Sequence, residues 1–216
     1  MAGKPIIIAD DHPLFRAALR QAVEGAAPGR KIIEASSLAA ARAATEKNTP
    51  GLLCLDLHME DSDGFAGLIT LRQDYPALPV AIISGSEDRS VVRRALSFGA
   101  AAFIPKSLDV GEIREAIAAV LDGESWSPVD SAAPEGEDPG LVDRLASLTP
   151  AQLKVLLLVR QGLLNKQIAF EMSISEATVK AHMTAIMRKL NVQNRTQAVL
   201  AAGALVLDTE AVRDDR

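Results

Sequence analysis

The chain of 216 residues has little of several residue types on which whole classes of protein depend. Its single cysteine, Cys54, cannot form an internal disulfide or a cysteine-rich zinc site. Aromatic residues make up 3%, too few for a stacking platform that binds single-stranded nucleic acid. No apolar run approaches the roughly 20 residues of a membrane span, and the N-terminal apolar run is too short for a signal peptide. These absences favour a cytoplasmic protein without membrane contact.

The remaining composition is that of an ordinary globular protein, with 48% hydrophobic and 24% charged residues. The length allows one or two domains. The net charge of −5 is unevenly distributed, because residues 145–208 hold seven basic and three acidic residues, whereas residues 123–144 hold one and six. A contact with a polyanion is therefore expected in segment 145–208.

Residues 1–122 alternate between short apolar runs and amphipathic stretches of helical length. The runs are rich in Ile, Val and Leu without polar alternation, as expected for strands buried on both faces. They are Ile6–Ala9, Lys31–Ala35, Leu52–Leu55, Val80–Ile83 and Ala101–Ile104. The helical stretches are Pro13–Glu24, Leu38–Lys47, Gly64–Asp74, Arg89–Phe98 and Val110–Leu121. This order predicts an α/β fold, a doubly wound five-stranded parallel sheet.

The rest of the chain changes character twice. Residues 123–144 are rich in Pro, Gly and acids and are interpreted as a flexible acidic linker, with Trp126 packed at the edge of the first domain. Residues 145–208 predict a small all-α domain, and residues 209–216 a charged tail. Four helices are expected here: Pro150 to about Gln161, a short helix through Glu171, Glu176–Leu190, and Thr196 to about Ala204. The first is capped by Thr149 with Gln152, the second by Asn165 and the third by Ser175.

Polar residues stand where the predicted strands end. Asp10 and Asp11 follow the first strand, Asp56 the third, Ser84 the fourth and Lys106 the fifth. The carboxyl ends of parallel strands meet in one crevice, and three carboxylates there repel unless a cation joins them. Oxygen ligands suit Mg²⁺, beside which a carboxylate can attack a phosphoryl group. One such acid alone is usually a helix cap, but the full set predicts a phosphoryl-accepting site.

These residues lie in segments that resemble the receiver domain of two-component response regulators, over essentially all of residues 4–122. The segments are Asp10-Asp11-His12-Pro13-Leu14-Phe15, Leu55-Asp56-Leu57-His58-Met59, Ser84-Gly85 and Phe103-Ile104-Pro105-Lys106-Ser107. The resemblance implies that Asp56 is the phosphoacceptor and that a sensor histidine kinase or phosphotransfer protein is a partner. It implies that Asp11 binds Mg²⁺ directly, Asp10 through water, and His58 through its backbone carbonyl.

The resemblance also implies roles for three further residues. Ser84 and Lys106 would contact the phosphoryl group, and Phe103 matches an aromatic switch position coupled to Ser84. One departure is Glu60-Asp61, where the family often has Pro-Gly, so this loop lacks a rigid turn and is expected to alter the phosphoryl lifetime. The neighbouring histidines also allow a transition-metal site, but without a thiolate we expect Mg²⁺.

The predicted helix Glu176–Leu190 has two different faces. Its apolar stripe consists of Val179, Met183, Ile186 and Leu190. Its opposite face is small, polar and basic, and consists of Ala177, Lys180, Ala181, Thr184 and Arg188. A short turn from Lys166–Glu171 leads into it, which is typical of a helix-turn-helix. The pattern alone fits an ordinary solvated helix equally well.

The wider pattern over about residues 146–205 resembles the LuxR-type DNA-binding domain. Its segments are Leu148–Gln152, Gly162–Ala169, Ile174–His182, Arg188–Val192 and Arg195–Ala198. With the receiver, the chain resembles a NarL/FixJ-class response regulator, which implies a homodimer on double-stranded promoter DNA after phosphorylation. The resemblance implies that Lys180, Ala181 and Thr184 face bases, and that the phosphate-side candidates are Thr178, His182, Lys189 and Arg195, with Arg188 on the same exposed face.

Two alternatives come from other classes. A Mg²⁺-dependent phosphatase would use Asp56 as its nucleophile, but the chain has no cap domain or pocket-sized insertion for a substrate. A DNA-binding dimer independent of phosphorylation would not need the intact acidic set. We therefore expect a phosphorylation-controlled transcription regulator and not an enzyme.

Overall fold

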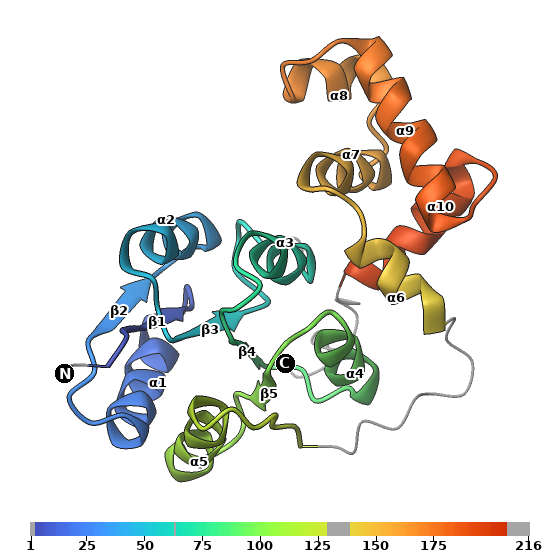
Figure 1. Ribbon diagram of the computed structural model, residues 1–216. Coiled ribbons are helices and arrows are strands. Elements are labelled where there is room, and N and C mark those ends of the chain that lie inside the picture. Colours follow the sequence, from blue (N-terminus) through green and yellow to red (C-terminus); the bar gives the residue numbers. More distant parts are fainter. Residues whose placement is uncertain (1–2, 63, 129–138, 207–216) are drawn as a thin grey trace, which may run out of the picture. The chain divides into compact units, whose positions relative to one another are not determined.

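The computed structural model describes residues 3–62, 64–128 and 139–206. The chain divides into two compact units, Met1–Pro134 and Glu135–Arg216, which are described separately (Figure 1). Within the described residues, every helix is too short or too polar to cross a membrane. The predicted tail and residues 129–138 of the predicted linker lie outside the described residues.

The first unit is built on a parallel five-stranded sheet in the order β2-β1-β3-β4-β5, which confirms the predicted fold. The strands are β1 (Ile6–Ala9), β2 (Ile32–Ala35), β3 (Leu52–Asp56), β4 (Val80–Ser84) and β5 (Ala102–Pro105). All except β2 are buried along their whole length, which explains why their sequences are apolar without alternation. The parallel register brings the carboxyl ends of the strands to one edge.

Five helices cover the sheet. They are α1 (Pro13–Ala26), α2 (Leu38–Asn48), α3 (Ala66–Asp74), α4 (Arg89–Ser97) and α5 (Val110–Leu121). Helices α1 and α5 lie on one face, and α2, α3 and α4 on the other (Figure 1). Under α1 and α5, Val23 and Ile117 pack with Cys54 of β3 in one apolar cluster. Helix α3 does not begin at Gly64 as predicted, because Gly64 has a φ of 58° and belongs to the preceding turn.

After α5 the chain returns to the sheet at Trp126. The Trp126 N–H donates to the Ala101 carbonyl at 3.3 Å, and the Trp126 carbonyl accepts from the Phe103 N–H at 3.1 Å. This parallel bridge lies beside Ala102 of β5, and the indole packs against the apolar cluster. The expected packing of Trp126 is confirmed, and the first residues of the predicted linker are part of the first unit.

The second unit is all helical. Its elements are α6 (Pro139–Ala146), α7 (Pro150–Arg160), α8 (Asn165–Glu171), α9 (Glu176–Leu190), α10 (Arg195–Ala202) and a 3₁₀ turn, Gly203–Leu205. The prediction of a linker as far as residue 144 was wrong, because α6 begins at Pro139 and packs against α9 with Leu145 fully buried. Proline is favoured in the first turn of a helix, so the Pro/Gly-rich composition hid this helix.

Local caps explain most helix starts in this unit. The box between Thr149 and Gln152 is present as predicted, and Ser175 caps α9. Asn165 is not the cap of α8, which begins after Leu164; the Leu164 N–H donates to the Gln167 side chain at 2.8 Å. The Asn165 side-chain oxygen instead accepts from Arg195 at 3.0 Å. A tertiary hydrogen bond therefore replaces the predicted local one.

Burial raises the pKa of the Cys54 thiol to about 12. Because the thiolate is the reactive form, we expect the folded protein to resist iodoacetamide at about pH 8. Labelling followed by intact mass should proceed only in urea concentrations that unfold the first unit. Complete labelling in native buffer, at the rate of a small exposed thiol, would contradict the buried position of Cys54.

Candidate functional site

The predicted acidic residues meet at the carboxyl edge of the sheet. Asp10 and Asp11 follow β1, and Asp56 ends the neighbouring strand β3. Asp10 and Asp56 are fully buried, whereas the Asp11 side chain is 22% exposed. Ligand atoms of Asp10, Asp11, His12 and Asp56 all lie within 4.8 Å of one another. The structure thus assembles the predicted carboxylates and adds the His12 imidazole to the group.

Lys106 holds the two buried carboxylates together. Its Nζ lies 2.7 Å from Asp10 Oδ2 and 2.8 Å from Asp56 Oδ2. Two buried negative charges are tolerated only when a positive charge compensates them, which this ammonium does. The same Nζ lies 4.8 Å from the centre of the Phe15 ring, and the Lys106 N–H donates to the Ser84 carbonyl at 2.7 Å. Lys106 is therefore fixed by both its backbone and its side chain.

Ser84 and Phe103 occupy neighbouring strands beside this group. Ser84 ends β4 opposite Pro105 of β5, and Phe103 lies two residues earlier on β5. Both are fully buried, and Ser84 Oγ accepts from the Ser86 N–H at 3.1 Å. The structure places both residues at the predicted positions, while the coupling between them stays a prediction.

The two histidines contact the carboxylates mainly through their backbones. The His12 N–H donates to Asp10 Oδ1 at 2.7 Å, and the His58 N–H donates to Asp56 Oδ1 at 3.1 Å. The His12 Nδ1 lies 2.7 Å from Asp11 Oδ1, with the side chain 65% exposed. The His58 Nδ1 is 3.9 Å from Asp56 Oδ1. These amides orient the buried carboxylates, whose remaining oxygens face Lys106.

Two residues that contact the site, and one in the loop beside it, were given no such contact by the sequence. Phe15 lies under Lys106, and the Arg16 guanidinium donates to the Asp10 carbonyl at 2.7 Å. Both belong to the first turn of α1, which begins directly after the acidic pair, so their position was a usable signal. Asp61 accepts from two backbone amides at the start of α2. No local pattern could reveal that contact, because its partners lie in another segment.

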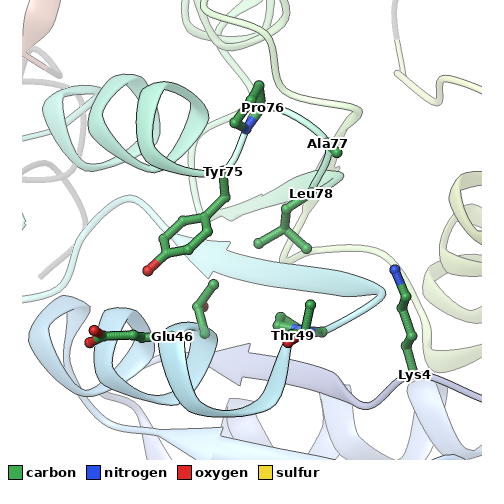
Figure 2. A pocket seen from close by; sticks show the side chains of 9 residues that line it. Lys4, Glu46, Thr49, Tyr75, Pro76, Ala77 and Leu78 are labelled. Atoms are coloured by element: carbon green, nitrogen blue, oxygen red, sulfur yellow. The ribbon is translucent and has the colours of Figure 1, made fainter.

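A separate hollow of about 220 Å³ lies at the opposite edge of the sheet (Figure 2). Lys4, Pro50 and Leu78 on its wall each precede a strand, so it opens at the amino ends of β1, β3 and β4. Figure 2 shows the Tyr75 ring on one side of the hollow and Glu46 of α2 below it. It is lined by none of the residues predicted for the phosphoryl site.

The second unit contains the predicted helix-turn-helix. Helix α8 ends in a turn in which Ser173 has a φ of 54°, and Ser175 Oγ then accepts from the Thr178 N–H at 3.0 Å to start α9. The predicted apolar stripe of α9 is confirmed as buried and consists of Val179, Met183, Ile186 and Leu190. Burial of this stripe fixes which face of α9 remains exposed.

The exposed face of α9 carries most of the predicted DNA contacts. Lys180, Ala181, Thr184 and Arg188 are exposed, as is Thr178, and His182 is half-buried. The Thr178 hydroxyl is 2.8 Å from Ser175 Oγ, so it takes part in the cap. Beside this face lies an open groove of about 490 Å³, lined by Asn165, Lys180, Met183, Thr184, Met187, Gln193, Asn194 and Arg195.

Lys189 and Arg195 differ from the other predicted contacts, because the side chain of each is bonded to a distant segment of the unit. The Lys189 Nζ donates to the Ser147 carbonyl at 2.7 Å and to Gln152 Oε1 at 2.9 Å. Arg195 donates to the Leu163 carbonyl and to Asn165. Their phosphate contacts stay predictions, but in the free protein these side chains join α9 and α10 to the rest of the unit.

Comparisons with known proteins assign a family to each of the two units. Residues 6–118 match the response regulator receiver domain, and residues 146–202 match the luxR family of bacterial regulatory proteins. The chain is 41% identical over 208 residues to the Glycerol metabolism activator of Pseudomonas putida, covering 92% of this chain and 94% of that protein. It is 35% identical over 199 residues to the nitrate/nitrite response regulator protein NarP of Escherichia coli, covering 90% and 92%.

Solved structures show the same folds. RcsB of Salmonella typhimurium superposes with a TM-score of 0.55 at 21% identity, covering 94% of this chain and 99% of that one. The receiver domain of the putative response regulator NarL from Mycobacterium tuberculosis gives a TM-score of 0.52 at 28% identity, covering 57% and 100%.

A receiver fold with buried aspartates, joined to a helix-turn-helix, defines a DNA-binding response regulator of a two-component system. The chain belongs to the response regulators with a LuxR-type DNA-binding domain, the NarL/FixJ class. This family consists of transcription regulators and not of enzymes, so the phosphatase alternative is discarded.

The internal bonds of Lys189 generate a prediction. Lys189→Met removes both hydrogen bonds, while Gln152 Oε1 keeps the Thr149 N–H and the exposed Ser147 turns to water, so the free energy of unfolding of the second unit should fall by about 1 kcal/mol. Arg188→Met removes the same charge from the adjacent exposed position and should change stability little. Urea unfolding followed by circular dichroism checks this, with Trp126 fluorescence isolating the first unit. Equal stability of the two variants would contradict the structural role of Lys189.

Proposed function

We propose that a sensor histidine kinase or phosphotransfer protein transfers a phosphoryl group to Asp56, and that the phosphorylated protein dimerises and binds promoter DNA in the cytoplasm. The supporting observation is the environment of Asp56, a buried strand-end carboxylate 2.8 Å from the Lys106 ammonium. A carboxylate in this position is accessible to a phosphoryl group only at the crevice where the strands end.

Mg²⁺ is the ion proposed for this site, and the residues fit it. Asp10, Asp11 and Asp56 bring three carboxylates and Lys106 one positive charge, so a divalent cation balances what remains. The donors are hard oxygens, as Mg²⁺ prefers. The carboxylates and the His58 backbone carbonyl would hold the ion. When bound, Mg²⁺ neutralises charge on the phosphoryl oxygens.

The side chains around Asp56 have separate tasks in the transfer. An Asp56 carboxylate oxygen forms the new bond to phosphorus as the phosphorus–nitrogen bond of a phosphohistidine donor breaks, and the donor imidazole leaves. Lys106 exchanges its contact with the carboxylate for one with a phosphoryl oxygen. The Ser84 hydroxyl donates to a second phosphoryl oxygen.

In the proposed switch, a structural change at Ser84 reaches the surface of the receiver. Movement of Ser84 towards the phosphoryl group lets Phe103 follow, which alters the surface formed by α4 and α5. The Phe103 N–H bonds the Trp126 carbonyl, so the same strand also holds the chain that leads to the second unit. Coupling of this kind is typically about 1–3 kcal/mol. The 41% identical relative is named an activator, so activation is the proposed sign of regulation.

Acetyl phosphate with Mg²⁺ should add one phosphoryl group to the protein at Asp56. Asp56→Asn keeps the side-chain shape but makes a poor nucleophile, so this variant should not be labelled, as measured by intact mass. Sedimentation of the labelled protein should show a dimer. The sedimentation of Asp56→Asn should not change when the phosphodonor is added. Undiminished labelling of Asp56→Asn would refute the phosphoacceptor, and labelling without any change in sedimentation would refute the switch.

For the DNA complex, we propose that Lys180, Ala181 and Thr184 face bases in the major groove. The phosphate-side candidates are Thr178, His182, Lys189 and Arg195, joined by Arg188; of the basic residues among them, Arg188 is exposed and Lys189 and Arg195 are half-buried. Residues 145–208, with seven basic and three acidic residues, carry few charges to spend on phosphates, so one copy binds weakly alone. Two copies on half-sites about one helical turn apart supply the affinity, which links DNA binding to dimerisation.

Lys180→Ala and Thr184→Ala should each cost about 1–3 kcal/mol on the preferred site and little on a scrambled duplex, because a base contact is lost. Arg188→Ala should weaken both duplexes similarly and lower the salt slope by about 1. Titrations of the phosphorylated protein at several salt concentrations measure both effects. Equal losses on both duplexes for every variant would show that this face of α9 does not read sequence.

A further inference from the structure

The loop that joins β3 to α3 borders the proposed metal site without a rigid Pro-Gly turn. It starts at Leu57, directly after Asp56, and carries the His58 carbonyl and the pair Glu60-Asp61. Met59 is 2% exposed, and the Ser62 N–H donates to its carbonyl at 2.9 Å. Leu57 and Phe65 are buried as well, so packing holds the two ends of the loop, whereas its exposed residues Glu60 and Asp61 depend on other contacts.

Asp61 supplies such a contact by capping a helix from outside. Its two carboxylate oxygens accept separately from the Leu38 N–H at 2.8 Å and the Ala39 N–H at 2.9 Å. These amides are the first of α2 and lie at the positive end of its dipole, where a carboxylate is favoured. The next amide, of Ala40, is bonded by Ser37 Oγ at 3.1 Å. Asp61 thus joins the loop to α2 by two charge-assisted hydrogen bonds.

Close packing supports the same junction. A Cβ atom on Gly67, in the first turn of α3, would lie 2.9 Å from the Leu38 side chain. The Leu38 side chain of α2 therefore packs against the first turn of α3 in the space that Gly67 leaves open. The loop ends where α3 begins, so the junction holds it at the α3 end while Asp61 holds its middle.

The fixed part of the loop contacts the metal ligands directly. The Glu60 N–H, next to Asp61 in the chain, donates to Asp11 Oδ2 at 3.3 Å. The His58 N–H donates to Asp56 Oδ1 at 3.1 Å. Movement of Asp61 away from α2 would shift these amides relative to both carboxylates.

We infer that Asp61 is a positioning residue for the metal site, which holds the Glu60 amide on Asp11 and the His58 carbonyl beside Asp56 by capping α2. This inference rests on the proposed function of the site. It also gives the Glu60-Asp61 pair a role, because the cap replaces the stiffness that a Pro-Gly turn would supply. Partners of metal ligands commonly tune affinity in this way.

Calorimetric titration of the unphosphorylated full-length protein with MgCl₂ tests the inference. Asp61→Ala should raise the Kd for Mg²⁺ by about tenfold, the lower limit for loss of an outer partner. Asp61→Asn keeps one acceptor oxygen and should lie between Asp61→Ala and the wild type. Glu60→Gln removes the same charge but keeps the backbone bond to Asp11, so it should change the Kd by about twofold or less.

A second measurement separates positioning from general damage. The initial rate of labelling by acetyl phosphate should need more Mg²⁺ in Asp61→Ala but should reach the wild-type plateau at saturating Mg²⁺. Hydrogen exchange at the Leu38 and Ala39 amides should accelerate in the same variant. A lower plateau with an unchanged half-saturating concentration of Mg²⁺ would overturn the inference.

Different results would contradict the role of Asp61 and the proposed metal site. Asp61→Ala with wild-type affinity for Mg²⁺, or equal losses in Asp61→Ala and Glu60→Gln, would show that Asp61 does not position the site. In that case Asp11→Asn still abolishes Mg²⁺ binding and Asp56 is still labelled. Unchanged Mg²⁺ affinity in Asp11→Asn would instead remove the proposed metal site itself.

Discussion

The contact of one lysine with two buried carboxylates is the constraint on which the first unit depends. Asp10 and Asp56 lie at the ends of neighbouring strands and are fully buried, so their mutual repulsion must be compensated locally. Lys106 provides this compensation from β5, at 2.7 and 2.8 Å. The Lys106 ammonium therefore lies at the open end of the strands, between the two carboxylates and within reach of both.

Strand β5 connects the lysine that compensates the two carboxylates with the segment that leads out of the first unit. β5 carries Phe103 and leads directly to Lys106, and its backbone also pairs with Trp126. In the proposed switch, a change in what Lys106 contacts would reach a strand that is also paired with the segment around Trp126. The physical link is a set of backbone hydrogen bonds, which do not depend on the identity of the residues between them.

In the second unit, tertiary bonds decide which basic side chains are available. Lys189 and Arg195 are used to hold the helices together, whereas Lys180 and Arg188 are exposed on α9. Local sequence cannot distinguish these cases, because all four residues are basic and lie on or next to the same helix.

The sequence alone predicted the two folds, which the structure confirms, and grouped the polar residues of the proposed phosphoryl site. Apolar runs and helical spacing reflect burial directly, and residues at the ends of parallel strands must meet at one edge, so Asp10, Asp11, Asp56, Ser84 and Lys106 could be grouped without coordinates. Only the tertiary structure showed α6 within the supposed linker, the bond of Asn165 to Arg195 and the cap of α2 by Asp61. Each of these depends on a partner from a distant segment, and periodicity and capping patterns carry information only about neighbours along the chain.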